Sequence, residues 1–189
     1  RMTAPTRSQL LAEAECLIRR GGYAAFSYAH LAEKIGITKA SIHYHFPTKQ
    51  HLVEDVAELA MSRFSEALAE IEGAHPDAIS RLQQYGELFL DGFDEQLRPL
   101  CCALSAELAA LPPSMGTKVR AYFDLHLEWL TRIIESGIEV GTLRWEGGAA
   151  SLACLILTTL EGGSLVGRAR QSKSEVLAGF VQVLALARG

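Results

Sequence analysis

The chain has 189 residues and a mass of 20.6 kDa, with 49% hydrophobic residues, 21% charged residues and a formal net charge of −4. This composition is typical of a soluble globular protein and excludes collagen-like and intrinsically disordered chains. The length predicts one domain or a small pair, with a core large enough to fold without disulfide bonds.

The first 73 residues have the pattern of four consecutive helices. Apolar residues recur at three- and four-residue steps, for example from Leu10 to Ile18, as on the buried face of a helix. Residues that can cap a helix N-terminus precede three of the segments, at Ser27, Thr38 and Thr48. Glycines end three of them, at Gly21, Gly22, Gly36 and Gly73. We expect the third helix to end at Phe46 and the fourth to cover residues 48–72.

The remaining residues predict five more helices, separated by proline and glycine. We place them at about 77–95, 100–110, 115–140, 148–167 and 173–187. Sustained alternation of apolar and polar residues, which would indicate strands, is not visible. The sequence therefore predicts an all-α fold of about nine helices. We divide it into domains at residues 1–47 and 48–189, which the helix over 48–72 bridges.

Several features favour a cytoplasmic location. The four cysteines have no CxxC spacing and no signal peptide ahead of them, which favours reduced thiols. They are Cys16, Cys101, Cys102 and Cys154. The longest apolar stretch, residues 149–160, is shorter than the ~20 residues that cross a bilayer, so we expect no membrane span. Arg1 precedes Met2, and we expect it to be a remnant of a tag or of cloning.

Charge is unevenly distributed along the chain. Residues 1–50 contain seven Lys or Arg and three Glu, a net charge of +4, so residues 51–189 carry −8. A basic segment joined to an acidic remainder favours an anionic partner for the first part, and nucleic acid is the natural candidate. Short windows also fluctuate by a few charges, so charge alone does not decide the question.

The segment over residues 27–49 has the pattern of a helix-turn-helix. Two short helices joined by a tight turn need a small residue where they cross, a residue that accepts positive φ, and a branched apolar plug. Ala32, Gly36 and Ile42 meet these three needs. The outer face of the second of these helices then carries Lys39, Ala40, Ser41, His43 and Tyr44. Such a face can enter the DNA major groove, which is about 12 Å wide.

This segment resembles the tetracycline-repressor (TetR) family of bacterial transcription regulators. The resemblance covers residues 8–55 and rests on Ser27, Ala32, Gly36, Thr38, Tyr44, His45, Phe46 and Lys49. One departure is His43, where the family usually has tyrosine. The resemblance implies an N-terminal three-helix DNA-binding domain and a C-terminal helical domain that binds a ligand and forms the dimer.

By this resemblance, ten residues are expected to contact DNA. Those at the third helix, which would face base edges or phosphates, are Thr38, Lys39, Ala40, Ser41, His43 and Tyr44. Those at the start of the second helix, which would meet the DNA backbone, are Ser27 and Tyr28. Thr48 and Lys49 would hold a phosphate at the N-terminus of the fourth helix, where a helix dipole and an ammonium together form an anion site.

The resemblance also implies an effector cavity among the C-terminal helices. The candidate residues are Phe89, Phe93, Cys101, Cys102, Phe123, His126, Trp129 and Glu161. Core packing is the alternative for each, and a histidine on an apolar helix face is more often a satisfied core residue. Cys101 and Cys102 are either small buried hydrophobes or thiols that report oxidants and electrophiles.

We expect no metal site, no cofactor and no catalytic residue. His43 and His45 form an HxH pair, but residues two positions apart on a helix point in nearly opposite directions. The sequence contains no glycine-rich phosphate loop, metal-ligand spacing or nucleophile elbow. We therefore expect that the protein is not an enzyme.

The stretch 149–160 is apolar nearly all round, and small residues follow it at 162–164 and 167. Such a helix must be buried on every side, which a small monomer scarcely provides. We expect a homodimer through this helix and the last one, and the TetR resemblance implies the same interface. A helix buried within a monomer is the alternative.

The sequence thus predicts a homodimeric transcriptional regulator without a membrane partner. We expect a repressor that leaves a palindromic operator in double-stranded DNA when a small-molecule effector binds the C-terminal domain. The alternatives are a repressor switched by thiol modification at Cys101 and Cys102, an activator, an interaction protein without DNA binding, and an all-helical enzyme.

Overall fold

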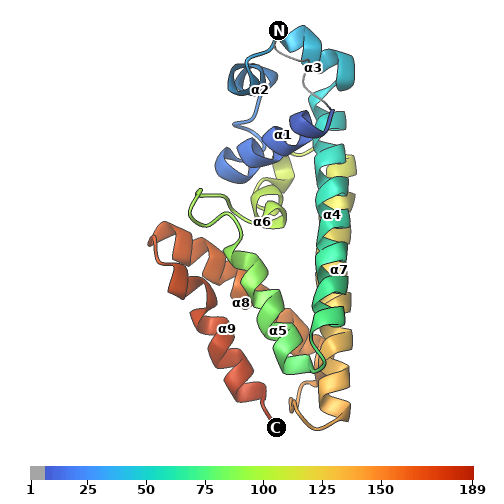
Figure 1. The fold of residues 1–189 in the computed structure, drawn as a ribbon, viewed down its shortest axis with the longest axis vertical. Helices are drawn as coiled ribbons and strands as arrows, with labels where there is room; N and C mark the ends of the chain where they lie inside the picture. The colour runs from blue at the N-terminus through green and yellow to red at the C-terminus, as the bar shows by residue number, and fades with distance from the viewer. Residues whose placement is uncertain (1–6) are drawn as a thin grey trace. The chain divides into compact units, whose positions relative to one another are not determined.

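The computed structural model describes residues 7–189, and the remnant expected at Arg1 lies outside them. Within this range the chain forms nine α-helices and no β-strand, which confirms the predicted all-α fold (Figure 1). The helices are α1 (Arg7–Gly21), α2 (Tyr28–Ile35), α3 (Lys39–His45), α4 (Lys49–Ala74), α5 (Ala78–Glu87), α6 (Leu100–Ser105), α7 (Pro113–Glu139), α8 (Gly148–Ala169) and α9 (Lys173–Ala187). Two 3₁₀ segments, η1 (Leu88–Leu90) and η2 (Leu108–Ala110), follow α5 and α6.

The helices pack into two compact units. The N-terminal unit contains the described residues up to Ser62 together with Leu100–Ala121. The C-terminal unit contains Arg63–Pro99 and Tyr122–Gly189. Helices α4 and α7 each contribute residues to both units, and α6 belongs to the N-terminal unit. The predicted division by function, with DNA binding in residues 1–47 and ligand binding and dimerisation in residues 48–189, stays a prediction.

The N-terminal unit has a core of aliphatic side chains from its first four helices. Leu10, Ile18, Leu31, Ile42 and Leu52 are fully buried. Burying one such side chain contributes about 1.5–3 kcal/mol. The predicted plug, Ile42, is therefore a main attachment of α3 to the rest of the unit.

The predicted N-caps define the starts of α2 and α3. Ser27 accepts a hydrogen bond from the backbone N–H of His30, and Thr38 accepts one from that of Ser41. Each cap of this kind contributes about 1 kcal/mol. Gly36 ends α2 with φ 77°, a left-handed conformation that a Cβ disfavours. Local contacts thus hold these two short helices in addition to the core.

The C-terminal unit has a core built from α5, α7, α8 and α9, in which Leu82, Leu130 and Leu160 are fully buried. Helices α8 and α9 lie side by side (Figure 1). A Cβ at Gly163 would overlap the backbone carbonyl oxygen of Val176. The small residues that the sequence shows in α8 therefore permit the close approach of α9.

One predicted helix ends earlier than expected. The helix expected over 77–95 stops as α5 at Glu87 and continues as η1 and a series of turns. Gly92 and Gln96 have φ values of 67° and 62°, which a right-handed helix does not contain. Phe93 is buried within this irregular segment, so its packing helps to hold the turns in place.

Helices α6 and α8 also differ in length from the prediction. Helix α6 ends at Ser105 and is followed by η2. Helix α8 has 22 residues and is predominantly apolar. The predicted absence of a membrane span rests on the shorter stretch 149–160. By length and composition alone α8 would reach across a bilayer, as core helices of water-soluble proteins also do.

Candidate nucleic-acid interface and effector site

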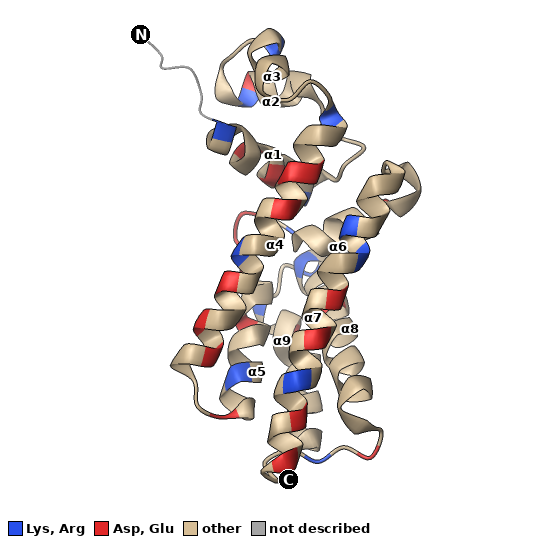
Figure 2. Ribbon diagram, turned by 90° about the vertical axis from the view of Figure 1, so that its right-hand side faces the viewer, with Lys and Arg blue, Asp and Glu red and all other residues tan. Residues whose placement is uncertain are grey.

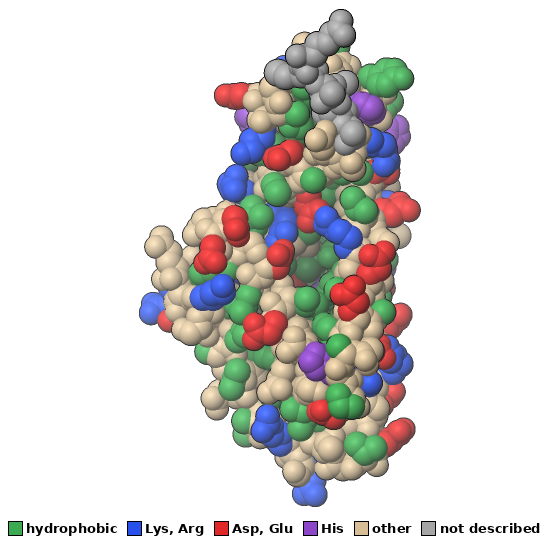
Figure 3. Space-filling model, in the orientation of Figure 1, with side chains coloured by type: hydrophobic (Ala, Val, Ile, Leu, Met, Phe, Trp, Pro, Cys, Tyr) green, Lys and Arg blue, Asp and Glu red, His purple; other side chains and the backbone are tan. Residues whose placement is uncertain are grey.

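Helix α3 presents the outer face that the sequence predicts. Lys39, Ala40, His43 and Tyr44 are exposed, and Ser41 is half-buried. Tyr44 exposes 86% of its surface. Acidic residues stand along α4 in Figure 2, whereas α3 contains none. On the face drawn in Figure 3, histidine and basic side chains are visible at this end of the N-terminal unit, with acidic side chains among them. The α3 surface therefore carries no negative charge of its own that would repel a phosphate.

The hydroxyl groups of Thr38 and Ser41 are partly engaged with each other. The Thr38 Oγ1 lies 3.3 Å from the backbone nitrogen of Ser41 and 3.0 Å from its Oγ. A hydroxyl donates one hydrogen bond and accepts two. The pair therefore keeps capacity to bond a further group.

Tyr28 connects the start of α2 with the end of α3. Its hydroxyl donates to the Phe46 carbonyl oxygen at 2.8 Å, and its ring meets the His43 ring edge-on with centroids 4.8 Å apart. Burial raises the pKa of Tyr28 to about 12, so its hydroxyl stays protonated. The His43 Nδ1 lies 3.2 Å from the Pro47 carbonyl oxygen. Because a carbonyl oxygen only accepts, Nδ1 donates this bond, and Nε2 can accept a hydrogen bond in the form of the ring that has a single proton.

Thr48 and Lys49 stand at the start of α4, and the Lys49 ammonium has partners inside the unit. Thr48 accepts a hydrogen bond from the His51 backbone N–H at 3.2 Å. The Lys49 Nζ donates to the Tyr23 carbonyl oxygen at 2.6 Å and lies 4.0 Å from the centre of the Tyr23 ring. Burial lowers the pKa of Lys49, and the Glu107 carboxylate partly offsets this effect. An ammonium has three N–H groups, so the bond to Tyr23 leaves donors for a phosphate.

Sequence reasoning missed Glu107, which holds the turn after α1. The Glu107 Oε2 accepts from the Ala24 backbone N–H at 2.7 Å. Gly22 has φ 89°, and a Cβ at this position would overlap the Glu107 carboxylate. The double glycine predicts a turn, but no local pattern indicates a carboxylate 83 residues further along the chain.

The eight predicted effector residues are divided between the units. Cys101 and Cys102 lie on α6 in the N-terminal unit and expose only 2% and 6% of their surfaces. This burial fits their interpretation as small hydrophobes, since reactive thiols are partly exposed. The six that belong to the C-terminal unit are Phe89, Phe93, Phe123, His126, Trp129 and Glu161.

His126 stands in the middle of aromatic rings, which together with it are called the aromatic cluster below. It stacks on Phe64 with ring centroids 4.1 Å apart. The other centroid distances from His126 are 5.4 Å to Tyr122, 5.8 Å to Tyr85, 6.2 Å to Phe89 and 6.3 Å to Phe123. The cluster brings two of the predicted residues, Phe89 and Phe123, to the predicted His126.

The two ring nitrogens of His126 differ in their partners. Nδ1 lies 2.6 Å from the Tyr85 hydroxyl oxygen. Nε2 is buried and has no hydrogen-bond partner among the residues that the structure describes. Burial lowers the pKa of His126 to about 3, so the imidazole is neutral at physiological pH. Only Nδ1 therefore has the hydrogen bond that is expected for a histidine in a protein core.

Trp129 stacks on Tyr85 of the aromatic cluster with ring centroids 5.5 Å apart, and Phe93 and Glu161 take other positions in the C-terminal unit. The Trp129 indole N–H donates to the Glu72 Oε1 at 2.7 Å, so this donor already has a partner. Phe93 lies under Arg168, whose guanidinium carbon is 5.4 Å from the centre of the ring. Glu161 is half-buried on α8.

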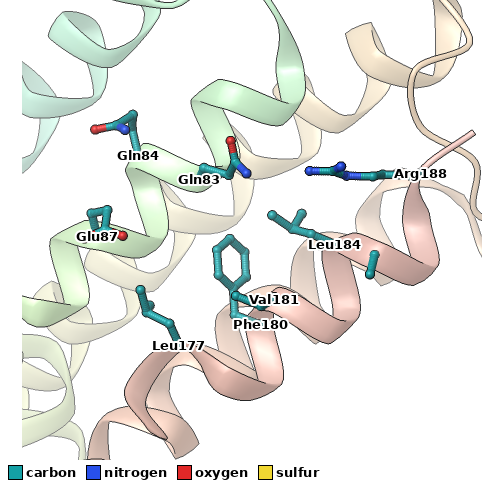
Figure 4. Close-up of a pocket in the computed structure, with 9 residues that line it drawn as sticks. Gln83, Gln84, Glu87, Leu177, Phe180, Val181, Leu184 and Arg188 are labelled. Atoms are coloured by element: carbon teal, nitrogen blue, oxygen red, sulfur yellow. The ribbon is translucent and has the colours of Figure 1, made fainter. Parts of the chain in front are cut away.

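A groove of ≈ 480 Å³ lies between α5 and α9 (Figure 4). Helix α5 lines it with Gln83, Gln84 and Glu87, and α9 contributes apolar side chains such as Phe180 together with nearby Arg188. None of the predicted effector residues lines this groove. The sequence gives no sign of it, because it depends on how two helices distant in the chain pack.

The chain is similar to bacterial transcription regulators over nearly its whole length. The family described as bacterial regulatory proteins, tetR family, matches residues 10–56. The crystal structure of a TetR-family transcriptional regulator from Agrobacterium tumefaciens is 31% identical, covers 97% of this chain and 97% of its own, and superposes with a TM-score of 0.92. The chain belongs to the TetR family.

Two further relatives agree with this membership. A TetR transcriptional regulator from Legionella pneumophila is 27% identical, with 100% of both chains covered and a TM-score of 0.89. Nucleoid occlusion factor SlmA from Marinomonas sp. (strain MWYL1) is 27% identical over 158 residues, which are 82% of this chain and 79% of that protein. TetR-family proteins are DNA-binding transcriptional regulators and not enzymes. The predicted family, its regulatory role and the expectation of a non-enzyme are therefore confirmed.

Proposed function

We propose that this TetR-family protein is a homodimeric repressor that leaves a near-palindromic operator when a small molecule binds its C-terminal unit. The observation that carries the proposal is the exposed face of α3, which contains no acidic residue and is attached through the buried Ile42. A helix presented in this way fits the major groove. A protein that acts on bacterial DNA works in the cytoplasm.

Within this proposal, side chains of α3 divide between the DNA backbone and the base edges. Tyr44 and Lys39 reach phosphates, because one offers an exposed hydroxyl and the other an ammonium. His43 reads a base amino group through Nε2, because its Nδ1 proton is directed at Pro47. The major groove offers such amino donors on adenine and cytosine.

Helices α8 and α9 supply the dimer interface. Large apolar side chains remain exposed on both, namely Leu155, Leu165 and Val166 on α8 and Val181 and Leu186 on α9. Leu186 exposes 75% of its surface and Val181 54%. A second copy of the chain, related by a two-fold axis, would cover this apolar face with the same face of its own.

The effector acts by linkage. Two copies of α3 would read half-sites separated by a helical turn of ~34–36 Å or a multiple of it. A small molecule can bind more tightly to a dimer in which the two α3 helices no longer match this spacing. It then lowers the affinity for DNA through a coupling free energy of ~1–3 kcal/mol. Helix α4 contributes residues to both units, so we expect the change of spacing to involve it.

Selection of the purified protein on random double-stranded DNA at near-physiological salt tests the proposal. We expect enrichment of one near-palindromic sequence. A Leu186→Glu variant should be monomeric in sedimentation and lose the preference for two half-sites, because a charge would then face the apolar surface. No enrichment by the wild type, repeated after bound small molecules are removed by unfolding and refolding, would overturn the proposal.

The burial of Cys101 and Cys102 favours a bound effector over thiol modification. The selected operator provides the test. A double variant, Cys101→Ala with Cys102→Ala, should be released from the operator by the same effector as the wild type. A response that disappears only in the variant would support the thiol switch instead.

A further inference from the structure

His126 is a polar group in an otherwise aromatic part of the C-terminal unit. The rings around it come from α4, α5, η1 and α7, and its contact with Phe64 is a stacked one. Phe123, on the same helix as His126, is half-buried, so the aromatic cluster reaches the surface on that side. The surroundings of His126 are therefore suited to a flat apolar ring.

The contact with Tyr85 indicates which nitrogen of His126 carries the proton. The Tyr85 hydroxyl oxygen is 2.6 Å from Nδ1. A phenolic hydroxyl is a good donor and a poor acceptor, whereas the bare nitrogen of a neutral imidazole is a strong acceptor, so we assign the hydroxyl as the donor and Nδ1 as the acceptor. A neutral imidazole has one N–H, so Nε2 carries the proton and offers a donor that has no partner among the described residues.

Water is a poor partner for this donor. A buried water usually makes two to four hydrogen bonds, and the rings of Phe64, Phe89 and Phe123 offer it no polar atom. The Tyr85 hydroxyl is already engaged with Nδ1. An ionised ligand is disfavoured as well, because it would lose its hydration among aromatic rings.

We infer that the effector is an uncharged aromatic compound whose hydrogen-bond acceptor, such as a ring-attached carbonyl oxygen, bonds the Nε2–H of His126. This inference rests on the proposed function, since it names the ligand class of the effector site. Tyr85 is the positioning residue, because its hydroxyl fixes both the orientation and the proton of the imidazole.

A pair of probes of similar size tests the ligand class. Acetophenone carries a carbonyl oxygen next to its ring, and ethylbenzene has the same outline without an acceptor. Calorimetry with the full chain should show that acetophenone binds about tenfold more tightly, as one added hydrogen bond implies. Nitrogen-15 NMR of the histidine side chains should show Nε2 of His126 protonated, and acetophenone should shift that resonance.

Two variants locate the binding. The His126→Phe variant keeps a flat ring but loses the N–H donor. It should therefore bind acetophenone and ethylbenzene about equally tightly. Gln83→Leu is the control, because Gln83 lines the separate groove between α5 and α9. Its preference should equal that of the wild type.

Three results would overturn the inference: equal binding of the two probes by the wild type, an unprotonated Nε2, or loss of the preference in Gln83→Leu. The probe measurements need no variant to fold. Release of the selected operator is measured separately. If acetophenone is preferred but releases no operator, the ligand class stands and the effector response in the proposed function fails.

Discussion

Replacing Lys49 by methionine separates two roles of one ammonium. The variant keeps the aliphatic stem and removes the charge that bonds the Tyr23 carbonyl oxygen and lies over the Tyr23 ring. It also removes the phosphate contact expected at the start of α4. The first role affects the free protein, and the second affects only the complex with DNA.

The structure sets the size of the first effect. A charge-assisted hydrogen bond contributes about 1.5–3 kcal/mol, and a cation over an aromatic ring adds about 0.5–1 kcal/mol where it is partly exposed. Burial opposes both, as the lowered pKa of Lys49 shows. We therefore expect a loss of about 2 kcal/mol in the free energy of unfolding. For a chain of this length the midpoint of thermal unfolding would fall by about 4–8 °C.

The salt dependence of operator binding measures the second effect. Each phosphate contact contributes a slope of about −0.9 to log K against log salt. A dimer has two copies of Lys49, so between 50 and 200 mM salt the wild type should lose about 12-fold more affinity than Lys49→Met. Lys34→Met is the matched control, because Lys34 is exposed on α2 and is not an expected contact. A lowered midpoint with an unchanged slope would refute the phosphate role of Lys49.

Three further predictions concern single side chains. Tyr44→Ala should weaken operator binding about tenfold and change the unfolding midpoint by less than about 2 °C, because the ring is 86% exposed; binding and melting curves check both. The Glu72 carboxylate accepts hydrogen bonds from Arg132 at 2.6 and 2.9 Å and from an indole N–H, which lowers its pKa from 4.5 to about 2. The stability it contributes is present above its unfolded pKa and lost as the pH falls toward 2, so Glu72→Gln should lower the urea midpoint more at pH 6 than at pH 3; equal effects would contradict this. Gly22→Ala should destabilise the protein by about 2 kcal/mol through positive φ and overlap with Glu107, and a double-mutant cycle with Glu107→Ala should recover part of that loss.

The helix-turn-helix could be predicted because its determinants are close together in the sequence. Ser27 bonds the backbone of His30, and Thr38 bonds that of Ser41, so each cap and its partner are three positions apart. Gly36 is recognisable because few other residues adopt its conformation. The buried side chain of Ile42 fixes the rotation of α3 about its axis, and the residues expected to contact DNA are left on the exposed side.

The contacts that the sequence could not predict join distant residues. Ala24 and Glu107 are 83 positions apart, and Tyr85 and His126 are 41 apart. Periodicity places His126 on the inner face of its helix but does not say which group meets each nitrogen. Gln96 has a positive φ that glutamine seldom adopts, so no pattern predicts the turns where a helix was expected.

The turns that follow α5 are joined to α8 by hydrogen bonds from one side chain. Arg168 on α8 is buried, and its guanidinium donates to the carbonyl oxygens of Leu97, Asp91 and Phe89 at 2.8, 3.1 and 3.3 Å. In a continuous helix such carbonyls would be bonded to N–H groups four residues later. The irregular backbone leaves them available, and α8 supplies the donors instead.

The same arrangement connects the proposed effector site with the proposed dimer interface. Phe89 belongs to the aromatic cluster, with its ring centroid 6.2 Å from that of His126, and its backbone carbonyl is bonded by Arg168. A ligand that shifts the backbone at Phe89 would therefore also disturb a hydrogen bond that holds α8. Since the exposed apolar side chains of α8 form part of the proposed dimer face, ligand binding can alter the geometry of the dimer through contacts within a single unit.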